Sequence, residues 1–248
     1  KILPVALRSV LYSDCISKFY YAAAVREKEP GQAARLRDFY LQEGEKLIRA
    51  YRTKDLRACL SAAARQFNEI CQERECPKVG VVGEIFLKFN PFAQKNVIEW
   101  LTEQGIEVVP SVLTDFFLPD FVYKSAYKIV GKQIEKFNQV GKEFRYFLPF
   151  KDIFEEADEA QKVISLNAQF GEGWLLPAEI MSYARQGIYN VISLQPFGCI
   201  ANHIVSKGIE KRIKSFYPEM NMLSLDFDSG VSDVNITNRL LLFIDHLK

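Results

Sequence analysis

The stretch that decides the fold is KVGVVGEIFLKFNPFAQKNVIEWLTEQGIEVV, residues 78–109. Its first part, Lys78–Phe86, is a Val- and Gly-rich apolar run that predicts a strand buried on both faces of a sheet. Apolar residues at helical spacing follow the turn at Asn90, and Gly105 is placed to end that helix. A second apolar run, Ile106–Val109, predicts another strand. Strand, helix and strand in this order indicate a βαβ unit with parallel strands.

The same alternation returns near the end of the chain. The segments YNVISLQPF (189–197) and MNMLSLDFDSG (220–230) have the pattern of strands, and each is followed by a segment with helical spacing. Four strands are therefore expected, near residues 79, 106, 190 and 221. We predict an α/β fold, with a four-stranded, mostly parallel, flavodoxin- or Rossmann-like sheet and flanking helices.

An additional helical region precedes the sheet. Residues 1–77 contain no strand pattern, and the segment GQAARLRDFYLQEGEKLIRAYR (31–52) places apolar residues near the helical period. A second helical stretch, rich in Phe and Tyr, occupies about 115–170 and reads as an insertion. The sequence thus predicts a helical region at 1–77 and an α/β domain at 78–248 that carries this insertion.

The composition excludes several classes of partner. Lys and Arg (32) nearly balance Asp and Glu (31), so no strong field favours nucleic acid or an anionic membrane. No apolar run approaches the roughly 20 residues that span a bilayer. Five cysteines at irregular spacing form no disulfide framework, which favours a reducing, cytoplasmic location. Because the chain begins at Lys1 rather than Met, we expect it to be a segment of a longer protein.

Two strand-end loops hold candidate polar residues, because parallel sheets bind ligands beyond the carboxyl ends of their strands. Glu84 and Asn90 lie in GEIFLKFNPF. A structural role in a turn and helix cap fits these two residues as well as a role in contacting a ligand. Asp226 and Asp228 lie in LDFDSGVSDVN and are candidates for Mg²⁺ or acid–base chemistry, although turn and capping roles fit better. Neither GxGxxG nor GxxxxGK[ST] occurs, which disfavours nucleotide binding.

The third loop, QPFGCIAN (195–202), carries a thiol at the start of a predicted helix. A helix N-terminus stabilises negative charge and so favours the thiolate of Cys199, the form that attacks electrophiles and binds metals. His203 lies one helical turn later. The pair Cys199 and His203 therefore fits three roles: the catalytic pair of a thiol hydrolase, two of the ligands of a zinc site, or packing without chemistry. The remaining cysteines are expected to be buried packing groups in helices: Cys15, Cys59, Cys71 and Cys76.

Three segments together carry a family resemblance: residues 79–109, ISLQPFGCIANHIVSKGIEKRI (192–213) and LSLDFDSGVSDVNITNRLLLFIDHL (223–247). In this order and spacing they resemble the 2-hydroxyacyl-CoA dehydratase component family. The resemblance is greatest to large CoA-substrate-specific enzyme activase proteins, in which a dehydratase-like region is joined to ATPase activase domains. It covers about 78–248, with a weaker match in the helical first third. QPFGC followed by the helix start NHI is its most specific motif.

The resemblance implies an iron–sulfur redox site. Cys199 matches a ligand position of a [4Fe-4S] cluster, and Glu84, Asn90, His203 and Asn235 are expected to line the site. The implied partners are an ATPase activase domain of the same or another chain and an acyl-CoA substrate. The other ligand cysteines of the family lie in an upstream α/β half that this sequence lacks, so the cluster belongs to the full-length parent and this segment alone need not retain it. The alternative is a non-catalytic structural or interaction domain with the same fold and no cluster.

Overall fold

The chain divides into two compact units in a computed structural model that describes residues 2–117, 127–228, 230 and 232–247. Unit 1 comprises Lys1–Glu75 and Val112–Lys151, and unit 2 comprises Cys76–Ser111 and Asp152–Lys248. The predicted insertion at 115–170 is therefore shared between the units, and its residues 118–126 lie outside the described part. Within the described residues, no helix is both long and apolar enough to cross a membrane.

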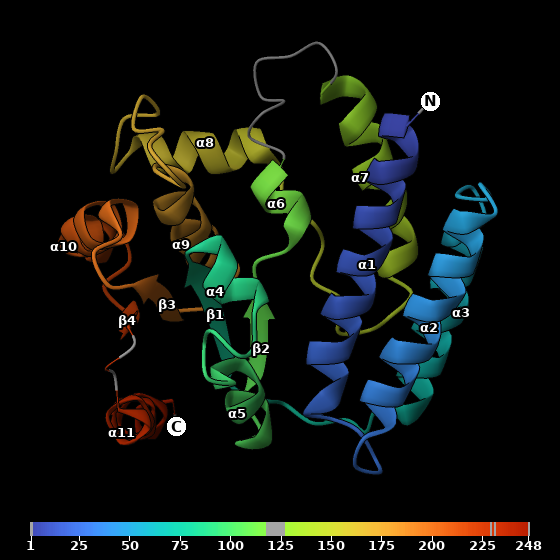
Figure 1. Cartoon of the computed structure of the whole chain (residues 1–248), viewed down its shortest axis with the longest axis horizontal. Coiled ribbons are helices and arrows are strands. Elements are labelled where there is room, and N and C mark those ends of the chain that lie inside the picture. The colour runs from blue at the N-terminus through green and yellow to red at the C-terminus, as the bar shows by residue number, and fades with distance from the viewer. Residues whose placement is uncertain (1, 118–126, 229, 231, 248) are drawn as a thin grey trace. The chain divides into compact units, whose positions relative to one another are not determined.

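Unit 1 is helical, which confirms the predicted N-terminal helical region (Figure 1). Its long helix α1 (Ile2–Ala24) packs against α2, α3, α6 and α7. Aromatic side chains fill the space between them: the Phe19 ring lies 5.7 Å from that of Phe67 and 4.9 Å from that of Phe144. The remaining helices of this unit are α2 (Gln32–Arg49), α3 (Leu56–Ile70), α6 (Leu113–Phe117) and α7 (Tyr127–Gly141).

Unit 2 contains a four-stranded parallel sheet, which confirms the predicted α/β class. The strand order is β2-β1-β3-β4, so the two βαβ halves meet where β1 lies beside β3 (Figure 1). The strands are β1 (Lys78–Gly83), β2 (Glu107–Pro110), β3 (Asn190–Pro196) and β4 (Asn221–Phe227). The helices are α4 (Ile85–Phe89), α5 (Val97–Glu103), α8 (Ile153–Gln161), α9 (Leu175–Arg185), α10 (Lys207–Phe216) and α11 (Asp233–Asp245).

The end of β1 differs from the prediction. The apolar run to Phe86 was expected to be one strand, but β1 ends at Gly83 and the next residues form the short helix α4. Gly83 has φ +123°, and a Cβ there would lie 2.0 Å from the carbonyl oxygen of Leu194 on β3. The side chain of Glu84 then caps α4 by accepting a hydrogen bond from the Leu87 N–H at 3.1 Å.

The helix that follows β3 is irregular at its start. A π-helical turn, η2 (Ala201–Ser206), precedes α10, where the sequence predicts one regular helix. Gly198, with φ +80°, makes the turn out of β3, and the N–H of Cys199 donates to the Pro196 carbonyl at 3.1 Å. Because a π-turn widens the helix by one residue, it changes which side chains face the sheet, and such turns are frequent at functional sites.

Candidate functional site

Strand register places a row of polar side chains on one face of the sheet at its carboxyl edge. A Cβ on Gly80 would meet the Tyr183 ring of α9, so this face of β1 lies under α9. Gly80 pairs with Val191, and side chains alternate along a strand, so Ser193 and Gln195 point to the same face. Asp226 of β4 pairs with Gln195 and continues the row.

Cys199 lies at this carboxyl edge, as the sequence predicts for a residue that follows β3. Its thiol is partly exposed. The sulfur accepts a hydrogen bond from the side-chain amide of Asn202 at 3.1 Å, and Asn202 is fully buried. Sequence reasoning did not identify Asn202, although its spacing of three residues from Cys199 within a helix was the available signal.

His203 contacts the backbone rather than the sulfur of Cys199. Its Nδ1 lies 3.1 Å from the Cys199 carbonyl oxygen, and its Nε2 lies 2.9 Å from Oδ1 of Asp226. Both ring nitrogens therefore face oxygen atoms, and neither has a hydrogen bond with the sulfur among the described residues. A ring held in this way is not placed to take a proton from the thiol, and the geometry does not support the Cys199–His203 hydrolase.

Asp226 is the centre of a small charged network. Oδ1 of Asp226 accepts from Nε2 of Gln195 at 2.5 Å, and Nζ of Lys207 lies 3.3 Å from Oδ2. Burial alone would raise the pKa of Asp226, but the hydrogen bonds from Gln195 and Lys207 and the charges of Lys207 and His203 lower that pKa below its ordinary value. Asp228 lies elsewhere, beside a different cleft, so the two carboxylates do not form the metal-binding pair considered from the sequence.

The other three residues expected to line the site form no hydrogen bond with Cys199 among the described residues. Glu84 belongs to the same edge, because its N–H donates to the Leu194 carbonyl of β3 at 2.9 Å. Asn90 is the C-cap of α4 and accepts from the Ala93 N–H at 3.2 Å. Asn235 is exposed on α11. Neither asparagine hydrogen-bonds to Cys199 or His203 among the described residues.

A buried ion cluster that the sequence did not reveal lies in the same unit. Nζ of Lys88 is 3.3 Å from Glu172 and 3.6 Å from Glu179, and all three side chains are less than a tenth exposed. Burial raises the pKa of Glu172 to about 7; Lys88 opposes this shift, and the charges of Glu179 and Glu84 add to it. The three residues come from α4, the segment before α9 and α9 itself, so no local pattern marks them.

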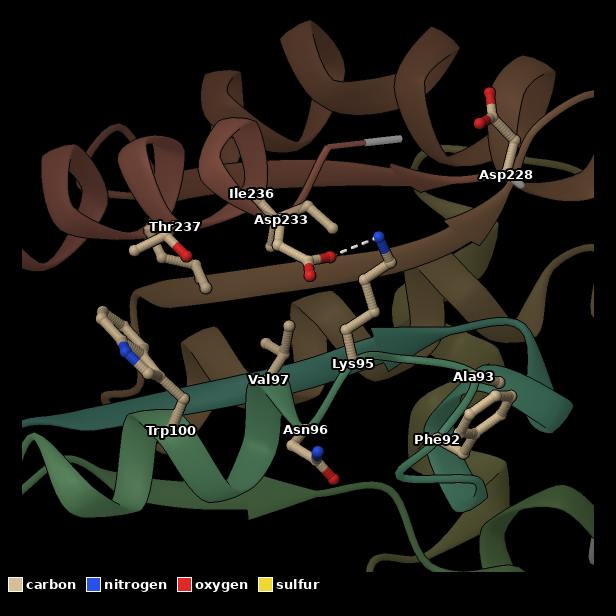
Figure 2. A pocket seen from close by; sticks show the side chains of 11 residues that line it. Phe92, Ala93, Lys95, Asn96, Val97, Trp100, Asp228, Asp233, Ile236 and Thr237 are labelled. Atoms are coloured by element: carbon tan, nitrogen blue, oxygen red, sulfur yellow. Dashed lines mark hydrogen bonds and ion pairs between the residues drawn. The ribbon is translucent and has the colours of Figure 1, made fainter. Parts of the chain in front are cut away.

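A cleft of about 620 Å³ lies between α11 and the segment that begins α5 (Figure 2). The Lys95 ammonium reaches across it to Asp233 at 2.5 Å, and Trp100 stands at one end of the lining (Figure 2). Ser232 is the N-cap of α11, and Asp233 lies in the first turn of this helix. None of the five predicted site residues is among those that line this cleft.

The cysteines other than Cys199 are only partly as expected. Cys15 and Cys71 are buried, but Cys59 and Cys76 are partly exposed. Cys71 is the C-cap of α3 and Cys76 lies in the link to β1, so these two are not inside helices. Among the described residues no three His, Cys, Asp or Glu side chains gather as metal ligands.

A [4Fe-4S] cubane takes about four thiolates in most proteins, and the residues around Cys199 provide one. The described residues therefore do not hold a complete cluster by themselves, and they fit at most a single ligand position. Comparison with known proteins adds no assignment, because no family model matches the chain and neither a curated protein nor a solved structure is similar to it.

Proposed function

We propose that unit 2 contributes Cys199 as one ligand to an iron–sulfur redox centre whose other ligands come from another domain or chain. The observation that carries the proposal is the placement of the thiol. It is partly exposed at the carboxyl edge of a parallel sheet, where such folds bind ligands, and its sulfur accepts a hydrogen bond from the buried Asn202 amide. Hydrogen bonds to ligand sulfur are one of the means by which proteins set the potential of a cluster.

Exposed apolar side chains around the thiol support a centre completed by a second protein surface. Phe197 is 72% exposed, Ile200 61% and Ile204 65%, and all three lie within five residues of Cys199. Large apolar side chains that gather in this way are typical of interaction surfaces. A covering surface would bring further ligands and exclude water from the cluster.

The redox role follows from the chemistry of the group. When bound, a [4Fe-4S] cluster takes up and releases single electrons, and this chain would hold one corner of it through Cys199. The sequence resemblance supplies the finer part of the proposal: an ATPase activase domain as the electron donor, an acyl-CoA substrate and a cytoplasmic location, where thiols stay reduced.

Anaerobic reconstitution tests the ligand assignment on the full chain. The chain is incubated with ferrous iron, sulfide and excess dithiothreitol, which supplies the missing thiolates, and iron, acid-labile sulfide and visible absorption are measured after desalting. We expect the wild type to retain iron and sulfide and Cys199→Ser to lose most of both. Cys76→Ser is the matched control, because Cys76 is also partly exposed.

Two results contradict the proposal. If Cys199→Ser binds as much iron and sulfide as the wild type, Cys199 is not the ligand. If the wild type binds neither, or if Cys76→Ser loses as much as Cys199→Ser, binding at Cys199 is absent or not specific. The exposed apolar side chains would then favour the second candidate, a non-catalytic interaction domain that has the same fold and no cluster.

A further inference from the structure

The cleft between α5 and α11 is built from one face of each helix and the loop before α5. Four of its lining residues lie on α11: Asp233, Ile236, Thr237 and Leu240. Their spacing of three and four residues places them on the same face of that helix. The facing wall holds Val97 and Trp100 of α5. A volume of about 620 Å³ is within the range of small-molecule sites.

Opposite charges meet in the middle of this cleft. The Lys95 ammonium lies 2.5 Å from Oδ1 of Asp233, and Figure 2 shows this ion pair with Trp100 to one side and Asp228 to the other. Lys95 and Asn96 have φ values of +54° and +55°, a left-handed conformation that is uncommon outside glycine. Backbone strain of this kind is concentrated at ligand-binding and active sites.

The charges that line the cleft disfavour a simple ion as its ligand. Among the described lining residues one is basic, Lys95, and two are acidic, Asp228 and Asp233. An anion would face two carboxylates, and a cation would face the ammonium. A ligand that carries both charges can meet each charged group of the cleft with the opposite sign, which is the arrangement that selects a zwitterion.

We propose that this cleft binds a free α-amino acid with a large apolar side chain. Its carboxylate would accept from the Lys95 ammonium, and its own ammonium would donate to Oδ2 of Asp233, so the ligand adds to the ion pair without breaking it. Its side chain would lie against the Trp100 ring, at the apolar end of the lining (Figure 2). The apolar lining near Trp100 includes Val97, Ile236 and Leu240.

This inference is independent of the proposed iron–sulfur role. Cys199 is not among the residues that line the cleft. An acyl-CoA carries phosphate groups, which the carboxylates of Asp228 and Asp233 would repel, so the two kinds of ligand would not share this site. Cys199→Ser should therefore bind the amino acid as the wild type does, whether or not Cys199 is a cluster ligand.

Isothermal titration calorimetry of the full chain provides the test. L-phenylalanine is compared with 2-phenylethylamine, which lacks the carboxylate, and with 3-phenylpropionate, which lacks the ammonium. We expect L-phenylalanine to bind with a Kd below about 1 mM and each analogue to bind at least about tenfold more weakly, because each loses one charge-assisted contact. A weaker Kd for L-phenylalanine, or an analogue that binds within that factor of it, would overturn the proposal.

Substitutions in the ion pair locate the site. Lys95→Met and Asp233→Asn should each weaken the binding of L-phenylalanine by about tenfold or more. Lys214→Met is the matched control, because Lys214 is similarly exposed and pairs at 2.6 Å with a glutamate of its own helix, outside the cleft. Both tryptophans, Trp100 and Trp174, lie in unit 2, so urea unfolding followed by their emission reports whether each variant is folded. If either ion-pair variant binds as the wild type does, or if Lys214→Met loses binding, the assignment is wrong.

Discussion

The environment of Cys199 depends mostly on a neutral side chain. His203 and Lys207 contact Asp226, and the hydrogen bond to the sulfur comes from Asn202. Asn202 is fully buried, so its orientation is set by packing and does not fluctuate as a surface amide would. The reactivity of the thiol should therefore follow the amide more closely than it follows the imidazole.

The first prediction concerns this amide. Asn202→Ala removes a fully buried amide together with its hydrogen bond to the sulfur of Cys199, so the free energy of unfolding of unit 2 should fall by about 1–3 kcal/mol. Urea unfolding followed by tryptophan emission measures this loss. Asn235→Ala, at an exposed asparagine of the same unit, should leave the midpoint unchanged. An unchanged midpoint in Asn202→Ala would mean that this amide does not stabilise the site.

Glu172 gives a prediction about pH. Its pKa is about 7 in the folded chain against an ordinary value of 4.5, chiefly because the carboxyl is buried. The folded state holds this proton more tightly than the unfolded state, so the stabilisation is complete below pH 4.5 and is lost as the pH rises through about 7. We expect the free energy of unfolding of unit 2 to fall across this window, with a contribution from Glu172 on the order of 3 kcal/mol.

In Glu172→Gln this part of the pH dependence should disappear, since the side chain no longer titrates. Urea unfolding followed by tryptophan emission at several pH values measures it. Glu155→Gln is the control, because Glu155 is an exposed residue of the same unit that pairs with Arg185. Parallel pH profiles for the wild type and Glu172→Gln would show that Glu172 does not carry the buried proton.

Single residues of the site were predictable where the signal was local. Cys199 follows Gly198 at a strand end, and that motif alone predicts a thiol at the carboxyl edge of the sheet. Gln195 and Lys207 belong to the site because their side chains contact the Asp226 carboxylate, and Asp226 lies on a different strand from Gln195. A contact between strands depends on register, and register is a tertiary property that the sequence alone does not specify.

At the scale of elements, the turn at the end of β1 should tolerate a larger residue poorly. Gly83 has φ +123°, and an added Cβ would lie 2.0 Å from the Leu194 carbonyl oxygen, a backbone atom of the adjacent strand. Gly83→Ala should cost at least about 3 kcal/mol through strain and overpacking. The urea midpoint of the tryptophan-monitored transition measures this loss.

Gly208→Ala is the matched control for that substitution. Gly208 lies in α10 with no atom near an added Cβ, so alanine should stabilise unit 2 by up to about 1 kcal/mol. If both alanine variants shift the midpoint equally, the close approach of β1 and β3 at Gly83 is not the determinant.

The predicted and observed elements agree where periodicity is long and strong. The four strands lie near the expected residues, and the region before residue 75 is helical as its pattern predicts. The helix α4 was missed because Ile85–Phe89 is a short apolar run that suits a strand as well as a helix. The π-turn η2 has no sequence signature, because a one-residue widening of a helix results from packing against the sheet.

At the scale of the whole molecule, each unit has its own apolar core. Phe67 is fully buried in unit 1 among Phe19 and Phe144, whereas Ile192 is fully buried in the sheet of unit 2. Separate cores generally fold and unfold as separate cooperative units. The chain passes between the units at residues 75–76, 111–112 and 151–152, a division that one-dimensional patterns do not reveal because unit 1 joins segments far apart in sequence.

The last prediction tests this independence. Phe67→Ala should destabilise unit 1 by about 3–5 kcal/mol, since it removes a buried ring from an aromatic cluster. Amide hydrogen exchange should then speed up in α1, α3 and α7, while the exchange of β1 and β3 and the unfolding monitored by Trp100 and Trp174 stay as in the wild type. Ile192→Ala should give the reverse pattern. If Phe67→Ala lowers protection equally in both units, the two cores unfold as one, and the site at Cys199 then depends on the helical unit as well as on its own sheet.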